Sequence, residues 1–137
     1  MKITPGLIWI GWITLVTLVF YIGVAFNVAR LRTRLGVLAP ASSGHPDFDR
    51  AQRIHMNTLE YLVPFLVLLW MCAIFFEPLW AAILGILWLF GRVIYAFGYW
   101  SAPQRRYPGF FIAMASLVLL FILTAYGLIR MGLVMGV

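Results

Sequence analysis

The chain has 137 residues, of which 64% are hydrophobic and only 10% are charged, and its formal net charge is +6. A typical soluble domain is about 45–50% apolar and about 25% charged, so this composition excludes an ordinary water-soluble domain. The mean hydropathy of +1.00 predicts an integral membrane protein instead.

Four apolar runs follow one another along the chain. The runs 7–29, 61–76 and 108–129 contain no charged residue, and Arg92 is the single charge in the run 79–100. A transmembrane helix needs about 20 apolar residues, so the second helix must begin upstream of its run, among polar residues. Long runs without alternation indicate helices rather than barrel strands. We predict an all-α integral membrane protein with four transmembrane helices, at 7–34, 47–76, 79–101 and 108–131, in a four-helix bundle that forms one domain over residues 1–137.

The first run is interpreted as a span rather than a signal peptide. It is longer than a signal-peptide h-region of about 7–15 residues. Three arginines follow it directly, as in a stop-transfer flank: Arg30, Arg32 and Arg34.

Basic residues gather at one end of the predicted helices. Eight of the ten lie in or near the two connections between helices one and two and between helices three and four: Arg30, Arg32, Arg34, Arg50, Arg53, Arg92, Arg105 and Arg106. Only Lys2 and Arg130 fall at the other end. The positive-inside rule therefore predicts that both connections are cytoplasmic. Topology accounts for the net charge, and the chain has no basic soluble module that would indicate nucleic-acid binding.

Residues 36–46 read GVLAPASSGHP, a loop composition, and Asp47 or Asp49 is then expected to cap the second helix. Cys72 is the only cysteine, which excludes an intrachain disulfide and a cysteine-based metal site, and we expect it to be a small buried apolar residue. No metal site is predicted. The expected location is a bacterial inner membrane, because no retention signal is evident, or the endoplasmic reticulum membrane in a eukaryote.

The second helix begins with a polar face. At 100° per residue, one stripe about 100° wide holds Arg53, Asn57, Glu60 and Tyr61, whereas His55 lies off the stripe. A solvated helix end with Arg53 and Glu60 paired would be a simple explanation. Glu60 lies deeper than that explanation allows, and ionisable groups at depth face protein or a wet cavity.

The third helix carries a matching stripe. Arg92, Tyr95 and Tyr99 follow i, i+3, i+7 spacing towards the connection with Arg105 and Arg106. Tyrosines at a membrane edge are often only an aromatic belt, but Arg92 lies inside the span and needs a polar or anionic partner. Two stripes of donors at one membrane end predict a site for a polar, anionic ligand, with apolar walls for a lipophilic second ligand.

Two motifs then stand out. RxHxNxxEY covers 53–61 and RxxYxxGYxxxxxxR covers 92–106. Together they resemble the MAPEG superfamily of membrane-associated proteins in eicosanoid and glutathione metabolism. Within it they are similar to the branch of microsomal glutathione transferases 2 and 3 and leukotriene C4 synthase.

The resemblance implies a homotrimer of four-helix subunits, surrounded by membrane lipid, that binds glutathione as co-substrate between neighbouring subunits. It implies a glutathione S-transferase that acts on lipophilic electrophiles, and it also admits peroxidase activity towards lipid hydroperoxides or a dedicated conjugating synthase. The glutathione-binding residues expected within one subunit, with Arg92 added from the stripe of helix three, are Arg53, Asn57, Glu60, Tyr61, Arg92, Tyr95 and Tyr99. The resemblance assigns Arg30 and His55 to the adjacent subunit and makes Arg106 the catalytic residue that activates the thiol.

Two other functions would also place polar residues inside a membrane bundle. A non-catalytic membrane protein that binds lipid or glutathione would not need a thiol-activating arginine, so Arg106 favours the enzyme. A small transporter would need a polar path across the whole span, and the outer halves of helices one, two and four show none.

Overall fold

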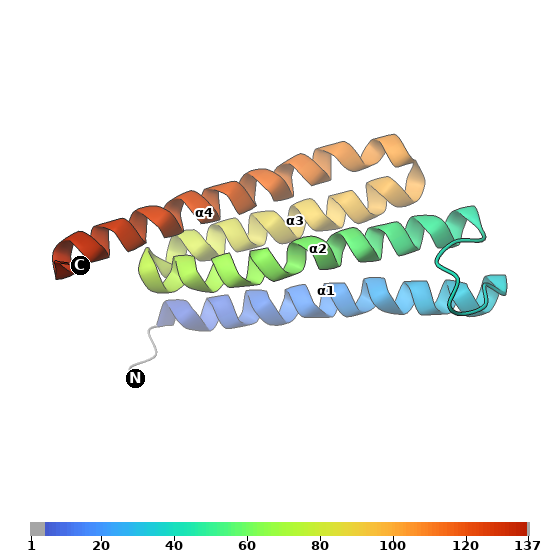
Figure 1. Ribbon diagram of the computed structural model, residues 1–137, viewed down its shortest axis with the longest axis horizontal. Coiled ribbons are helices and arrows are strands. Elements are labelled where there is room, and N and C mark those ends of the chain that lie inside the picture. The colour runs from blue at the N-terminus through green and yellow to red at the C-terminus, as the bar shows by residue number, and fades with distance from the viewer. Residues whose placement is uncertain (1–4, 137) are drawn as a thin grey trace.

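Four long helices make up the computed structural model, which describes residues 5–136 (Figure 1). They are α1 (Pro5–Leu35), α2 (Pro46–Phe75), α3 (Pro78–Ser101) and α4 (Tyr107–Met135), with a short 3-10 helix, η1 (Pro103–Arg106), between α3 and α4. The chain from 5 to 136 contains no strand, and all four helical segments are long and apolar enough to cross a membrane. The prediction of an all-α, multi-pass membrane protein is confirmed. Lys2 lies outside the described residues.

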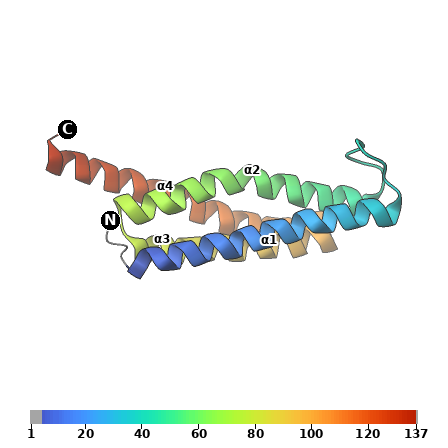
Figure 2. The same cartoon turned by 90° about the horizontal axis from the view of Figure 1, so that it is seen from below.

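The helices run alternately up and down, so both predicted cytoplasmic connections lie at one end of the molecule (Figure 1). The loop between α1 and α2 and the η1 turn share this end, which we call the loop end. The α2–α3 turn and both ends of the described chain lie at the opposite end. Figure 2 shows that the last turns of α4 project beyond the other helices there.

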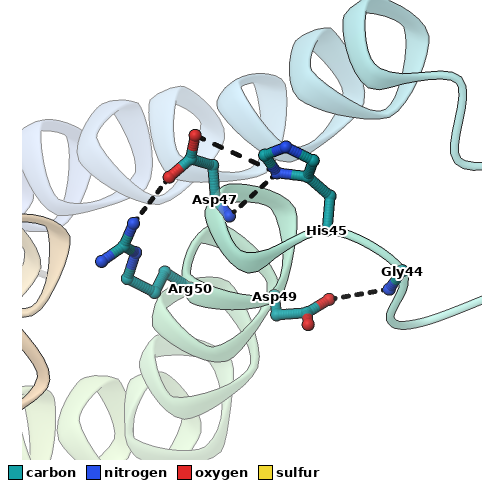
Figure 3. Close-up of polar contacts among 5 residues, drawn as sticks. All are labelled: Gly44, His45, Asp47, Asp49 and Arg50. Carbon is teal, nitrogen blue, oxygen red and sulfur yellow. Dashed lines mark hydrogen bonds and ion pairs between the residues drawn. The ribbon is translucent and has the colours of Figure 1, made fainter.

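The cap of α2 differs from the prediction that Asp47 or Asp49 would supply it. The N-cap is His45, whose Nδ1 accepts a hydrogen bond from the backbone N–H of Asp47 at 3.2 Å (Figure 3). Pro46 is favoured at the first helical position, which starts the helix earlier than expected. Asp47 and Asp49 therefore lie inside the first turn, where Asp47 pairs with Arg50 at 2.6 Å and Asp49 accepts from the backbone N–H of Gly44 at 3.0 Å.

The end of α4 also differs. The sequence predicts that this helix ends at about residue 131. In the structure Gly132 keeps a helical backbone, and the helix continues to Met135. It ends at Gly136, whose φ of 72° is the left-handed conformation that terminates many helices.

Packing brings α3 and α4 into close backbone contact. A Cβ added at Gly91 would lie 2.6 Å from the backbone nitrogen of Ala113, and one at Gly109 would meet the backbone of Tyr95. Only glycine allows this approach, which sets α3 against the start of α4 at the loop end.

An aromatic stack anchors α2 to α3 in the core, where the rings of Phe65 and Trp88 lie 3.8 Å apart and almost parallel. Cys72 is fully buried nearby, as the sequence predicts. Large apolar side chains such as Trp9, Val19 and Phe97 are exposed on the outside, as expected for contact with lipid or another subunit.

Candidate functional site

A cleft at the loop end brings together polar residues from α2, α3 and η1. Its volume is about 430 Å³. The residues that line it are Arg53, Asn57, Tyr95, Tyr99, Arg106, Tyr107, Phe110 and Phe111. The cleft thus brings together only part of the two stripes that the sequence indicates. Arg53 and Asn57 of helix two and Tyr95 and Tyr99 of helix three line it, together with Arg106.

Arg106 lies between two aromatic rings. Its guanidinium carbon is 5.3 Å from the ring centroid of Tyr99 and 5.1 Å from that of Tyr107. Cation–π attraction to both rings holds the planar group in place. The neighbouring Arg105 is exposed and does not line the cleft.

Gly98 determines how closely η1 folds back on α3. A Cβ added there would lie 2.9 Å from the carbonyl carbon of Arg105. The carbonyl of Gly98 also accepts hydrogen bonds from the backbone N–H of Ala102 at 3.0 Å and from the hydroxyl of Ser101 at 2.9 Å. The glycine of the second motif thus places the turn that carries Arg106 directly over the end of α3.

Arg92 has the polar partners that its depth requires. Its side chain is 1% exposed and donates to Asn57 Oδ1 at 3.1 Å and to Thr58 Oγ1 at 2.8 Å. The guanidinium also lies 4.3 Å from the ring centroid of Tyr95. Arg92 does not line the cleft, so it adjoins the site from behind.

Glu60 and Tyr61 lie at the margins of the cleft rather than among the residues that line it. The Nδ2 group of Asn57 donates to Glu60 Oε2 at 3.4 Å, and the Glu60 side chain is exposed. Tyr61 packs edge-on against Phe110, with ring centroids 6.1 Å apart. Arg53 and Glu60 do not form an ion pair within the described chain.

His55 and Arg30 lie away from the cleft, as the helical wheel predicts for His55. The ring of His55 stacks on Tyr21 of α1, and its Nε2 is 3.1 Å from the Tyr21 hydroxyl. Arg30 donates to Asn27 Oδ1 at 3.0 Å and lines a separate, mainly apolar groove of about 470 Å³ between α1, α2 and α3. Neither side chain lines the cleft.

Sequence reasoning missed the wall that α4 contributes, which consists of Tyr107, Phe110 and Phe111. Their spacing, three and four residues apart at a helix start, was a signal that these rings share one face. Thr58 was also missed, because a threonine within an apolar stretch carries no signal of its own. Across residues 5–136 there is no group of three or more His, Cys, Asp or Glu that could hold a metal ion.

Comparisons with known proteins match nearly the whole chain. The model of the MAPEG family matches residues 9–126. An uncharacterized protein of Synechocystis sp. is 43% identical over 114 residues, which cover 83% of each chain. Human microsomal glutathione S-transferase 2 is 35% identical over 104 residues, which cover 76% of this chain and 71% of the human protein. Bovine leukotriene C4 synthase is 35% identical over 105 residues, which cover 77% and 70%.

Both motifs of the sequence, from Arg53 to Tyr61 and from Arg92 to Arg106, fall inside the matched region. The chain belongs to the MAPEG family.

Proposed function

We propose that this protein is a membrane-bound glutathione transferase, which activates the thiol of glutathione for attack on a lipophilic electrophile. Family membership supports a glutathione-related transferase, since two relatives are named microsomal glutathione S-transferase 2 and leukotriene C4 synthase. The observation that carries the proposal is the cleft, where the guanidinium groups of Arg53 and Arg106 share one cavity with the amide of Asn57.

The charges of the cleft complement those of glutathione, which carries two carboxylates, one ammonium group and a thiol. Arg53 is suited to a carboxylate because its planar fork can donate two hydrogen bonds. Glu60 is exposed beside the cleft and is suited to the ammonium group. The phenols of Tyr95 and Tyr99, with Tyr61 at the margin, offer further hydrogen bonds and apolar contact.

Arg106 is the proposed catalytic residue. A free thiol has a pKa near 8.5, so only a few per cent is thiolate at pH 7. Lowering that pKa by about two units requires roughly 2.7 kcal/mol of differential stabilisation. A guanidinium stays protonated, so one at hydrogen-bond distance from the sulfur stabilises the thiolate relative to the thiol. After the thiol proton has left to solvent, the thiolate sulfur forms a bond to the electrophilic carbon. In a substitution, the bond from that carbon to its leaving group breaks and the group departs as an anion. In an addition to an α,β-unsaturated carbonyl compound, the carbon–carbon π bond breaks and the adjacent carbon takes up a proton from solvent.

The proposed enzyme is a homotrimer in which each cleft is completed by a neighbouring subunit. His55 faces Tyr21 of α1, and Arg30, which α1 carries, lines the separate groove, so neither lines the cleft of its own subunit. In the trimer they would bind glutathione held by the adjacent subunit. The loop end, which carries eight basic residues, is proposed to face the cytoplasm and its glutathione.

The direct test is incubation of the purified protein in detergent with glutathione and, separately, a chloronitrobenzene, an α,β-unsaturated lipid aldehyde and a lipid hydroperoxide. The proposal expects a thioether product with at least one carbon electrophile. Product from the hydroperoxide alone would make the protein a glutathione peroxidase. Tight glutathione binding without any turnover would identify a non-catalytic binding protein, and absence of binding would overturn the proposal.

A further inference from the structure

Arg92 is held by two acceptors from adjacent residues of α2. Its two terminal nitrogens donate to the side-chain oxygens of Asn57 and Thr58, at 3.1 and 2.8 Å. The hydroxyl of Thr58 in turn donates its only proton to the backbone carbonyl of Ile54 at 2.7 Å. Because that proton is already used, the Thr58 oxygen can act only as an acceptor towards Arg92.

The same contacts determine which way the amide of Asn57 points. A guanidinium has donors and no acceptor, so the group of Asn57 that faces Arg92 must be its carbonyl oxygen. The NH₂ group then points to the other side, where it donates to the carboxylate of Glu60 at 3.4 Å. Asn57 lines the cleft whereas Arg92 does not. Arg92 thus fixes the orientation of the Asn57 NH₂ donor at the cleft, although Arg92 itself does not line the cleft.

Burying the charged side chain of Arg92 costs free energy that packing alone would not explain. It is 1% exposed, its Nε has no hydrogen-bond partner, and both ion pairs of the described chain lie at the start of α2, away from it. Buried charges without an ionic partner cost several kcal/mol, and an apolar side chain of similar volume would often be at least as stable. A role in orienting Asn57 accounts for an arginine at this buried position.

We propose that Arg92 is a positioning residue for glutathione. Thr58 holds the guanidinium of Arg92 in place, and Arg92 in turn orients the Asn57 amide so that its NH₂ group points at an oxygen atom of the bound tripeptide. The inference rests on the proposed function, because it names glutathione as the ligand. It differs from a direct contact between Arg92 and glutathione, since the guanidinium acts entirely through Asn57. Thr58 becomes a determinant of affinity although it is fully buried and lies outside the cleft.

A double-mutant cycle on glutathione binding tests this. Thr58→Val keeps the shape of the side chain and removes the acceptor for Arg92, whereas Thr58→Ser keeps the acceptor. We expect Thr58→Val to weaken glutathione binding about three- to tenfold, the loss of one hydrogen bond, and Thr58→Ser to stay within about twofold of the wild type. In an Asn57→Ala background, Thr58→Val should cause no further loss. Equilibrium dialysis of radiolabelled glutathione against protein in detergent gives the four dissociation constants of the cycle and that of Thr58→Ser.

The outcomes separate the two proposals. The positioning role would be overturned if Thr58→Val lowered the affinity for glutathione equally in the wild-type and Asn57→Ala backgrounds. It would also be overturned if Thr58→Ser lowered the affinity as much as Thr58→Val does. Absence of glutathione binding by the wild type would overturn the proposed function and this inference together. If Thr58→Val does not fold, Arg92→Lys replaces it in the cycle, because one ammonium group cannot bridge both acceptors in the same geometry. Additive losses in that cycle would equally exclude the positioning role.

Discussion

The guanidinium of Arg106 lies over the ring of Tyr99, 5.3 Å from guanidinium carbon to ring centroid, although seven positions of sequence and a helix end separate them. The contact joins η1 to the last turn of α3 and directs one cation to the cleft. Arg105 comes from the same short helix yet is exposed outside the cleft. The two arginines therefore form a matched pair for experiment.

Arg106→Ala should leave glutathione binding largely intact but raise the pKa of the bound thiol. The chemical step should slow by about tenfold to a hundredfold, or roughly 1.4–2.7 kcal/mol. The ultraviolet absorbance of bound thiolate, followed as a function of pH, measures this directly. Arg105→Ala is the control and should titrate like the wild type. An unchanged titration in Arg106→Ala, or a change confined to Arg105→Ala, would reject Arg106 as the catalytic residue.

Arg53→Ala and Glu60→Ala should each weaken glutathione binding about tenfold or more, equivalent to at least about 1.4 kcal/mol, because each removes the partner of an oppositely charged group. Equilibrium binding in detergent measures the effect. Arg34→Ala and Glu77→Ala are controls that remove the same charges at exposed positions outside the cleft. Normal affinity in both cleft variants would place the glutathione site elsewhere.

Gly98→Ala should impair catalysis more than folding. The added Cβ would lie 2.9 Å from the carbonyl carbon of Arg105, so the turn that carries Arg106 must move away from α3. A displacement on the order of 1 Å can slow a reaction up to about a hundredfold, and we expect conjugation to fall about tenfold or more. Gly11→Ala is the matched control, because a Cβ there meets nothing within 4 Å. Normal turnover in Gly98→Ala would show that the close approach does not position Arg106.

Both connections at the loop end should be accessible from the cytoplasm. In a Cys72→Ala background, cysteines introduced at Ser43 and Ala102 should react with a membrane-impermeant thiol reagent only when the inner side is open to it. A cysteine at Glu77, in the turn at the opposite end of the bundle, should react from the outside. The reverse labelling pattern would show that the chain crosses the membrane in the orientation opposite to the proposed one.

The sequence by itself determined the parts of this protein that depend on residues close together along the chain. Run length and hydropathy identified four membrane helices, since each helix satisfies its own backbone polar groups. Helical periodicity placed Arg53 and Asn57 on one face and His55 on another, because that angle is a property of a single helix. The structure agrees on both points. It has four helices long and apolar enough to cross a membrane, and Asn57 lines the cleft whereas His55 stacks on Tyr21.

Only the tertiary structure decided how those faces meet. Periodicity within α3 could not show that Arg92 points to Asn57 and Thr58 rather than to a ligand, because the rotation of one helix against another is set by packing. Here the close approach at Gly91 and Gly109 sets α3 against α4 and adds Phe110 to the cleft. Local sequence encodes which residues share a helix face, whereas contacts between helices determine which of them line a cavity and which are buried behind it.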